Sequence, residues 1–249
     1  MKKDQISLEL YTVREAAKVD FAGTLAKVAA VGYPAVEFAG LHGMSAEAVR
    51  AELDRNNLNG ASAHVPYDRF VNEFDTVIAE MRTLGCEYAI IPWIGPEHRS
   101  TVAGAKAFAA SVGEIGTRVR DAGLGFAYHN HDFEFADLEG TGSRLWDFLF
   151  AQEDVNLELD VYWVYYGGAD PAALVAEAPE RYPLLHFKDM AGSGADRHDA
   201  PIGKGSVNFA PLLASSATNT HWYVVEQDNP ADAFSDIATS YTGMNALIG

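Results

Sequence analysis

The sequence predicts one closed (β/α)8 barrel, a TIM barrel, and three observations lead to that prediction. The chain has 249 residues, which is close to the roughly 250 residues that this fold typically needs. Short apolar β-type runs recur about every 25 to 35 residues and alternate with stretches of helical periodicity. No linker, low-complexity segment or G-x-G-x-x-G pattern points to a second domain or an open dinucleotide-binding sheet. We therefore expect a single domain over residues 1–249.

Eight short runs are the predicted strands. Most of them are too apolar to expose one face to water, and a parallel barrel requires strands that are buried on both faces. Because the strands run parallel, their carboxyl ends are expected to meet at one rim, where barrel active sites are built. The runs cover residues 6–11, 34–39, 60–67, 88–93, 125–131, 155–160, 183–189 and 222–228.

The segments between these runs predict helices. Phe21, Leu25 and Val28 repeat at helical spacing behind a candidate N-cap at Asp20, and Gly32 supplies a stop signal. The stretch 192–205 is the longest irregular segment and is predicted to be a loop at the substrate-binding face. Further helices are predicted over 70–81 and 108–119, after residues 141, 171 and 230, and as a short segment within 205–216.

The charge balance restricts the partners of the protein. The chain has 18 Lys and Arg residues against 35 Asp and Glu residues, so its formal net charge is −17 at pH 7. Nucleic acid is not expected to bind, because that requires clustered basic residues. No apolar run reaches the ~20 residues of a membrane span, and no signal peptide is recognisable, so we expect a cytoplasmic protein. The single cysteine, Cys86, lies in an apolar stretch and is expected to be a buried, inert thiol.

The last four predicted strands each end in side chains that titrate or bind metals. Residues two apart on a strand point to the same face, so such pairs are expected to converge on the mouth of the barrel. The pairs are His129 with His131, Glu158 with Asp160, and His186 with Lys188, and Glu37 and His64 hold comparable positions on the second and third strands.

These strand ends predict a metal site. Asp160, His186 and Glu226 form a mixed nitrogen and oxygen set that suits Mn²⁺, Co²⁺, Mg²⁺ or Zn²⁺. Lys188 either pairs with the adjacent Asp189 or takes part in the chemistry. Aromatic residues at the strand ends either pack in the core or form an aromatic wall for a sugar. They are Trp93, Tyr162 and Trp163.

Seven motifs resemble those of the sugar phosphate isomerase/epimerase family of xylose isomerase-like TIM barrels. The resemblance spans nearly the whole chain, and it implies a divalent metal, often Mn²⁺, held by one residue from each of strands five to eight. The motifs are GYxxVE at 32–37, SAHVP at 62–66, YHNHDFEF at 128–135, LELDVYWV at 157–164, LLHFKDM at 184–190, GKGSVNF at 203–209 and VVEQD at 224–228.

The resemblance assigns three ligands and leaves the fourth open. Asp160, His186 and Glu226 match the family ligands of strands six to eight. On strand five many relatives have a glutamate, whereas this chain has His129 and His131 around an asparagine. Either histidine could be the ligand, and an alignment by Asn-His selects His129. Related ketose epimerases use the glutamates of strands five and eight as paired acid and base, so this chain keeps only Glu226 of that pair.

The predicted function is metal-dependent isomerisation or epimerisation of a keto-sugar through an enediolate. Glu226 is the first candidate base, and Glu134, His131 or Lys188 is the second. Glu158 is expected to orient a metal-bound histidine. Substrate contacts are predicted from Glu37, His64, Trp93, Trp163 and Arg197.

Other functions remain open on the same residues. The principal alternative is a metal-dependent lyase, hydratase or hydrolase that acts on a 3-keto-sugar or inosose by elimination next to a ketone. An abasic-site nuclease is disfavoured by the −17 charge, and a sugar-binding barrel without activity would tolerate loss of Asp160 or Glu226. Barrels of this type often pair, so a homodimer is compatible with the sequence. The Gly203-Lys204-Gly205 turn is too short a signal to predict a phosphate site.

Overall fold

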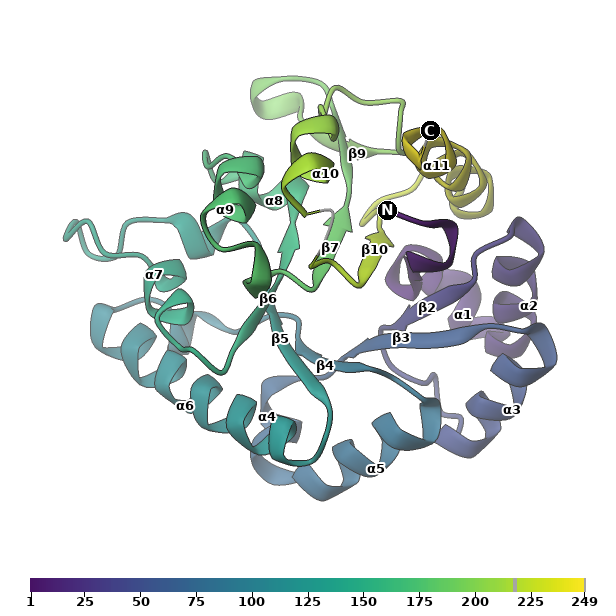
Figure 1. Ribbon diagram of the computed structural model, residues 1–249, viewed down its shortest axis with the longest axis horizontal. Helices are drawn as coiled ribbons and strands as arrows, with labels where there is room; N and C mark the ends of the chain where they lie inside the picture. The colour runs from purple at the N-terminus through teal and green to yellow at the C-terminus, as the bar shows by residue number, and fades with distance from the viewer. Residues whose placement is uncertain (217–218, 249) are drawn as a thin grey trace.

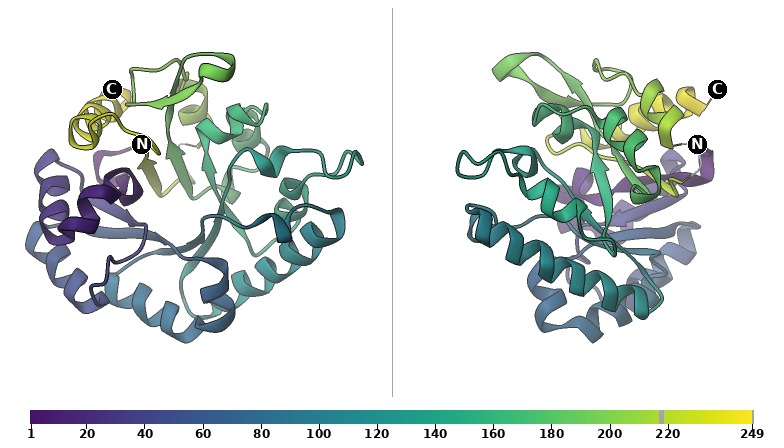
Figure 2. Two further views of the ribbon diagram at one scale, coloured as in Figure 1. Left: turned by 180° about the vertical axis from the view of Figure 1, so that it is seen from behind. Right: turned by 60° about the vertical axis from the view of Figure 1, so that its left-hand side comes forward.

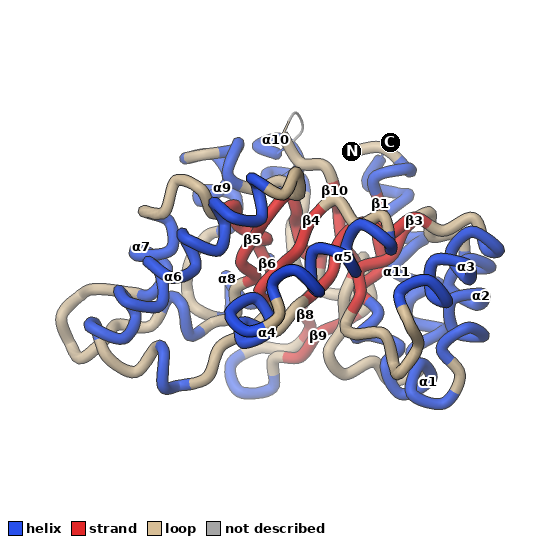
Figure 3. Tube along the Cα trace, turned by 90° about the horizontal axis from the view of Figure 1, so that it is seen from below, coloured by secondary structure: helices blue, strands red, loops and turns tan. Residues whose placement is uncertain are grey.

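The computed structural model, which describes residues 1–216 and 219–248, is a closed barrel of eight parallel strands. Figures 1 and 3 show these strands in the middle of the molecule with the helices around them. The order around the barrel is β1-β10-β7-β6-β5-β4-β3-β2, so the last sequential strand pairs with the first. The predicted fold class is therefore confirmed, and each predicted run overlaps one barrel strand. The strands are β1 (Ile6–Glu9), β2 (Ala35–Phe38), β3 (Asn59–His64), β4 (Tyr88–Ile91), β5 (Gly125–His129), β6 (Asn156–Asp160), β7 (Leu184–Phe187) and β10 (Trp222–Val225).

The helices predicted from the sequence are present in the structure, with one difference. The Asp20 side chain accepts a hydrogen bond from the Gly23 amide at the start of α2, and Gly32 ends that helix with a φ of 114°. The predicted helix over 70–81 is instead two helices, which meet at Glu73, where φ is −134° and ψ is 31°. The helices are α1 (Arg14–Val19), α2 (Phe21–Val31), α3 (Ala46–Asn56), α4 (Tyr67–Asn72), α5 (Phe74–Leu84), α6 (Val102–Asp121), α7 (Leu145–Phe150), α8 (Val161–Tyr166), α9 (Pro171–Glu177), α10 (Ala210–Ser216) and α11 (Ala233–Ile248). Among the described residues, no helix is long and apolar enough to cross a bilayer.

The interior of the barrel changes character along the strands. Alternate residues of a strand point inward. Further from the carboxyl ends of the strands, the inward positions are apolar and form a cluster that includes Ala35, Ala127, Leu184 and Val224. The next inward position on each of these four strands, two residues further on, carries an ionisable side chain. These side chains are Glu37, His129, His186 and Glu226, all of them buried.

The segment predicted to be an irregular loop, 192–205, is partly a hairpin. The strands β8 (Asp189–Ala191) and β9 (His198–Ala200) pair antiparallel, and the hairpin projects from the body of the barrel (Figure 2). The Asp189 carboxylate organises the return of the chain, because it accepts backbone N–H bonds from Gly203 and Gly205, both at 2.9 Å, and from Val207 at 3.0 Å. A Cβ atom on Gly205 would lie 2.3 Å from the carboxylate, so this position requires glycine. The glycine-rich turn thus binds the protein's own carboxylate.

Candidate functional site

Four ionisable residues from the last four barrel strands meet at the carboxyl end of the barrel. His129 and Asp160 end β5 and β6, His186 lies in β7, and Glu226 follows β10. Strand register brings Asp160 opposite His186. One potential ligand atom from each residue lies within 4.8 Å of those of the other three, and all four side chains are buried. His131 is not a member of this group, so the structure distinguishes the two histidines that the sequence left as alternatives.

The donor set of this group suits a divalent cation. Two imidazoles and two carboxylates are the ligand types that Zn²⁺ or Mn²⁺ binds. Asp160 Oδ1 accepts a hydrogen bond from the Trp163 amide at 3.0 Å. Asp160 Oδ2 is buried without a hydrogen bond, since Lys188 Nζ lies 3.2 Å away but is not aligned to donate one. A buried carboxylate oxygen that accepts no hydrogen bond is costly, and a bound cation would satisfy it. The residues present therefore fit a metal ion.

Carboxylates behind the group hold its histidines in place. His186 Nε2 lies 2.7 Å from Glu37 Oε1, and His186 Nδ1 lies 3.0 Å from Glu226 Oε2. Burial opposes ionisation of Glu37, but His64 and His186 hold its pKa well below the usual range. Glu37 can therefore only accept, and it fixes the His186 ring with Nδ1 toward the site. This buried carboxylate was predicted to contact substrate; the structure places it behind His186 instead.

Glu158 plays the same part for His129. Its Oε2 lies 3.1 Å from His129 Nδ1 and 2.8 Å from His64 Nε2. Burial, together with the neighbouring His186 and His64, holds the pKa of His129 well below its usual value, so this ring is neutral. A neutral ring that donates from Nδ1 leaves Nε2 free as a ligand atom. The geometry matches the positioning role expected for Glu158.

Lys188 lies among the three carboxylates of Asp160, Glu226 and Asp228, which form the acidic part of the site. Its Nζ is 2.9 Å from both Glu226 Oε2 and Asp228 Oδ2 and 3.2 Å from Asp160 Oδ2, and the side chain is fully buried. Burial alone would lower the pKa of Lys188, but these three carboxylates raise it well above the usual value. A raised pKa keeps the amine protonated, which disfavours the predicted role of Lys188 as a second base. The expected pair with Asp189 is also absent, because that carboxylate binds backbone amides.

The position of Glu134 also disfavours its predicted role as a base. Its carboxylate accepts hydrogen bonds from Tyr128 Oη at 2.7 Å and from the His131 amide at 2.8 Å. The side chain is fully buried and does not line the cavity described below. Burial raises its pKa to about 8. Glu134 thus stabilises the turn that follows β5.

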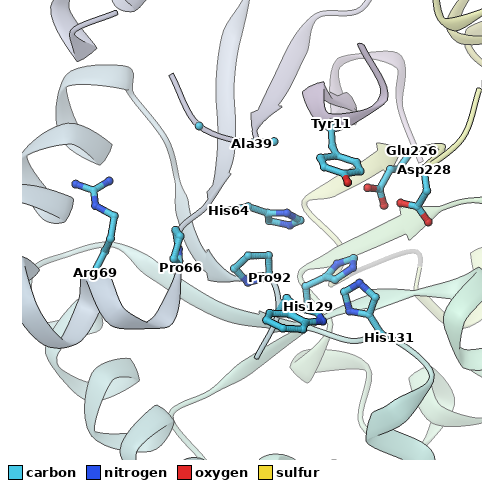
Figure 4. Close-up of a pocket in the computed structure, with 12 residues that line it drawn as sticks. Tyr11, Ala39, His64, Pro66, Arg69, Pro92, His129, His131, Glu226 and Asp228 are labelled. Carbon is cyan, nitrogen blue, oxygen red and sulfur yellow. The ribbon is translucent and has the colours of Figure 1, made fainter. Parts of the chain in front are cut away.

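A cavity of about 600 Å³ adjoins the group and is lined by two of its four residues, His129 and Glu226. In Figure 4 the rings of His64, His129 and His131 and the carboxylates of Glu226 and Asp228 face a common space. Trp93 and Tyr11 also line it, with 51% and 42% of their surfaces exposed. The lining residues are Tyr11, Ala39, Gly40, His64, Pro66, Arg69, Pro92, Trp93, His129, His131, Glu226 and Asp228.

Besides Glu37, two predicted substrate contacts lie outside this lining. Trp163 packs against His131, with ring centroids 5.4 Å apart. Arg197 lies over the Tyr166 ring at 4.6 Å and donates to the Gly194 carbonyl oxygen. Neither side chain lines the cavity.

Sequence reasoning missed two residues of the site. Glu9 is fully buried at the end of β1, where register sets it opposite Glu37. The sequence pattern that could have identified Glu9 is a charged residue that alternates with apolar ones in ISLELY, as Glu158 does in LELD. Asp228 lines the cavity and binds Lys188, and burial together with Glu226 raises its pKa to about 6. The sequence pattern that could have identified Asp228 is its spacing of two residues from Glu226, which places both side chains on the same face.

The buried Glu134 makes the stability of the fold depend on pH. Its folded pKa of about 8 lies above the usual glutamate pKa of 4.5, so its contribution to stability is complete below pH ~4.5 and is lost as the pH rises toward 8. Relative to Glu134→Gln, the wild type should lose about 1–3 kcal/mol of unfolding free energy between pH 5.5 and 7.5. Denaturant unfolding at both pH values measures this, with Glu114→Gln on the exposed face of α6 as the control. Parallel stability curves for wild type and Glu134→Gln would contradict the assignment.

Comparisons with known proteins agree with this architecture. The family model described as xylose isomerase-like TIM barrel matches residues 25–240. The rhizopine catabolism protein MocC of Rhizobium meliloti is 24% identical over 240 residues, which cover 82% of this chain and 73% of that protein. Inosose dehydratase of Geobacillus kaustophilus (strain HTA426) is 22% identical over 255 residues, which cover 84% of this chain and 80% of that protein. The crystal structure of a sugar phosphate isomerase/epimerase from Parabacteroides distasonis ATCC 8503 superposes with a TM-score of 0.81 at 23% identity, covering 98% of this chain and 97% of that one. The chain belongs to the xylose isomerase-like TIM barrel family.

Proposed function

We propose that this protein is a divalent-metal-dependent isomerase or epimerase that moves a proton next to the carbonyl of a keto-sugar. The observation that carries the proposal is the group of His129, Asp160, His186 and Glu226, whose ligand atoms lie within 4.8 Å of one another and two of whose members line the cavity. These four residues would hold the ion, with Mn²⁺ as the first candidate and Co²⁺, Mg²⁺ or Zn²⁺ as alternatives. Such an ion supplies Lewis-acid stabilisation of the negative charge that develops on a substrate oxygen.

The residues of the chain itself supply the proton transfer. Glu226 faces the cavity as an ionised carboxylate: burial opposes its ionisation, but Lys188 and His186 hold its pKa well below the usual value. Asp228 faces the same cavity from the same strand end, and Lys188 fixes its carboxylate at 2.9 Å. We assign Asp228 as the second acid or base, in the place that the sequence gave to Glu134, His131 or Lys188. A base must come within hydrogen-bond reach of the proton that it abstracts, and Asp228 meets that requirement for a ligand in this cavity.

His131 would orient the substrate. It lines the cavity, and its Nδ1 atom has no hydrogen-bond partner. Its ring stacks on Phe133 with an interplanar angle of 6°, which fixes the direction of the nitrogen. Burial and the nearby Lys188 lower its pKa to about 3, so the ring is neutral. A neutral imidazole can donate to a carbonyl or hydroxyl oxygen without adding charge to the site.

Elimination from a 3-keto-sugar or inosose is the second candidate function. The same proton abstraction leads to elimination when the substrate has a leaving group two carbons from the carbonyl. The similarity to inosose dehydratase, 22% identical, and the histidine in place of the strand-five glutamate favour this candidate. The two functions differ in their products, because only elimination releases water or an alcohol.

The cavity favours an uncharged substrate. Among the described residues, Arg69 is the only lysine or arginine in the lining, and its guanidinium already binds Glu73 at 3.0 Å and Glu80 at 2.9 Å. The two carboxylates that line the cavity would repel a phosphate. The exposed rings of Trp93 and Tyr11 offer apolar faces to the C–H groups of a sugar ring. We therefore propose a sugar without phosphate or carboxylate groups.

Proton abstraction can be measured as exchange with solvent. Mn²⁺-loaded protein is incubated in D₂O with uncharged ketoses and 3-keto-glycosides, and NMR follows deuterium at the carbon next to the carbonyl. Asp228→Asn should lower the exchange rate by about 100-fold or more, whereas Glu134→Gln, outside the cavity, should keep it. Release of water or an alcohol would favour the lyase. Exchange at the wild-type rate in Asp228→Asn would contradict its assignment.

Ligand charge can be tested with a matched pair. D-fructose 6-phosphate is expected to bind at least about tenfold more weakly than D-fructose at equal ionic strength, because the lining carboxylates repel it. Trp93→Ala should weaken binding of the uncharged sugar by about tenfold through loss of stacking. Calorimetry measures both, with Val71→Ala as the control, since Val71 is equally exposed but outside the cavity. Tighter binding of the phosphate would contradict the proposed substrate class.

A further inference from the structure

The ammonium group of Lys188 occupies a position between three carboxylates. Nζ lies 2.9 Å from Glu226 Oε2, 2.9 Å from Asp228 Oδ2 and 3.2 Å from Asp160 Oδ2. The only other ion-pair partners that these carboxylates have among the described residues are His129 and His186. Among the described residues, Lys188 is therefore the only lysine or arginine that pairs with these three carboxylates.

Two of these three carboxylates also belong to the four-residue group. Asp160 and Glu226 are members, whereas Asp228 is not. The same Glu226 oxygen is approached by Lys188 Nζ at 2.9 Å and by His186 Nδ1 at 3.0 Å. An ion held by the group and the ammonium would thus share oxygen atoms, and they would repel each other at short distance.

The surroundings prevent Lys188 from leaving the site. The side chain is fully buried, so its charge has no route to water. The rings of Tyr162 and Trp163 lie 5.8 and 5.4 Å from Nζ, where their faces attract a cation. The remaining partner, Asp228, has a side chain that is 26% exposed and lies outside the group. The ammonium can keep Asp228 while it releases the other two carboxylates.

We propose that Lys188 is an internal cation that competes with the metal ion and so sets the metal affinity of the site. It neutralises Asp160 and Glu226 in the metal-free protein and yields them, while keeping Asp228, when a divalent ion binds. The inference rests on the proposed metal site, and it makes Lys188 a positioning residue. Its consequence is that removal of the charge should weaken the metal-free fold and strengthen metal binding.

The test compares wild type with Lys188→Met, which keeps an unbranched side chain without the charge. Mn²⁺ affinity is measured from the EPR signal of the free ion, and melting temperature is measured with and without Mn²⁺. Lys188→Met should bind Mn²⁺ at least tenfold more tightly than the wild type does. Its melting temperature without metal should be lower, and Mn²⁺ should raise that temperature by more than it does in the wild type. Lys204→Met, an exposed lysine, controls for the change in net charge and should leave the affinity within twofold.

A second measurement uses the wild type alone, in case Lys188→Met does not fold. Lys188 is the only fully buried lysine among the described residues. Its ammonium protons should therefore exchange slowly with water, which makes its ¹⁵Nζ signal observable. One equivalent of Zn²⁺ should shift that signal stoichiometrically. An unmoved signal with Zn²⁺ bound, or equal Mn²⁺ affinity in wild type and Lys188→Met, would overturn the inference and leave the metal site intact. Absence of metal binding in the wild type would overturn both.

Discussion

The burial of carboxylates at the carboxyl end of the barrel is the constraint on which the rest of the site depends. Glu9, Glu37, Glu158 and Asp160 have no exposed surface. Burial raises the pKa of Glu9, Glu158 and Asp160, whereas His64 and His186 hold the pKa of Glu37 well below its usual value. An isolated charge buried in this way would be prohibitively costly. The cost is offset because imidazoles lie between the carboxylates. His186 bridges Glu37 and Glu226, and other histidines contact Glu158. Removing any one partner leaves a buried charge unpaired, so the network is expected to act as a unit.

The closed strand ladder makes this network possible. Register fixes Glu9 opposite Glu37, His129 opposite Glu158, and Asp160 opposite His186. Directly below, an apolar layer fills the barrel and excludes water. The charged groups are therefore held on a rigid wall in a medium where electrostatic interactions are strong. Only the cavity side of the layer remains open, and there Glu226 and Asp228 meet the space available to a ligand.

The sequence predicts the strands and most of the site because both depend on local alternation. An apolar strand that ends in a charged residue identifies Asp160, His186 and Glu226 without tertiary information. Alternation cannot separate His129 from His131, since residues two apart share a face. The separation comes from the end of β5 at His129, after which the chain turns and leaves His131 on the cavity wall.

Other errors have the same origin in tertiary structure. Glu134 lies near the correct rim, but the 3-10 helix Phe133–Phe135 directs its carboxylate to Tyr128. Lys188 has an acidic neighbour in sequence, yet that neighbour is engaged with backbone amides of a loop more than ten residues away. Its real partners come from β6 and from the segment after β10. Pairing between these neighbouring strands depends on the order of the strands in the barrel, and no local pattern encodes that order.

Metal content is the most direct test of the central claim, which is that the four-residue group binds a divalent ion. The protein is purified without added metal or an affinity tag, and metal per chain is measured by mass spectrometry in wild type and in an Asp160→Asn, Glu226→Gln double variant. The account predicts about one Mn, Co or Zn per wild-type chain and almost none in the folded double variant. Absence of metal from the wild type, even after Mn²⁺ is offered, or equal content in both proteins, would contradict it.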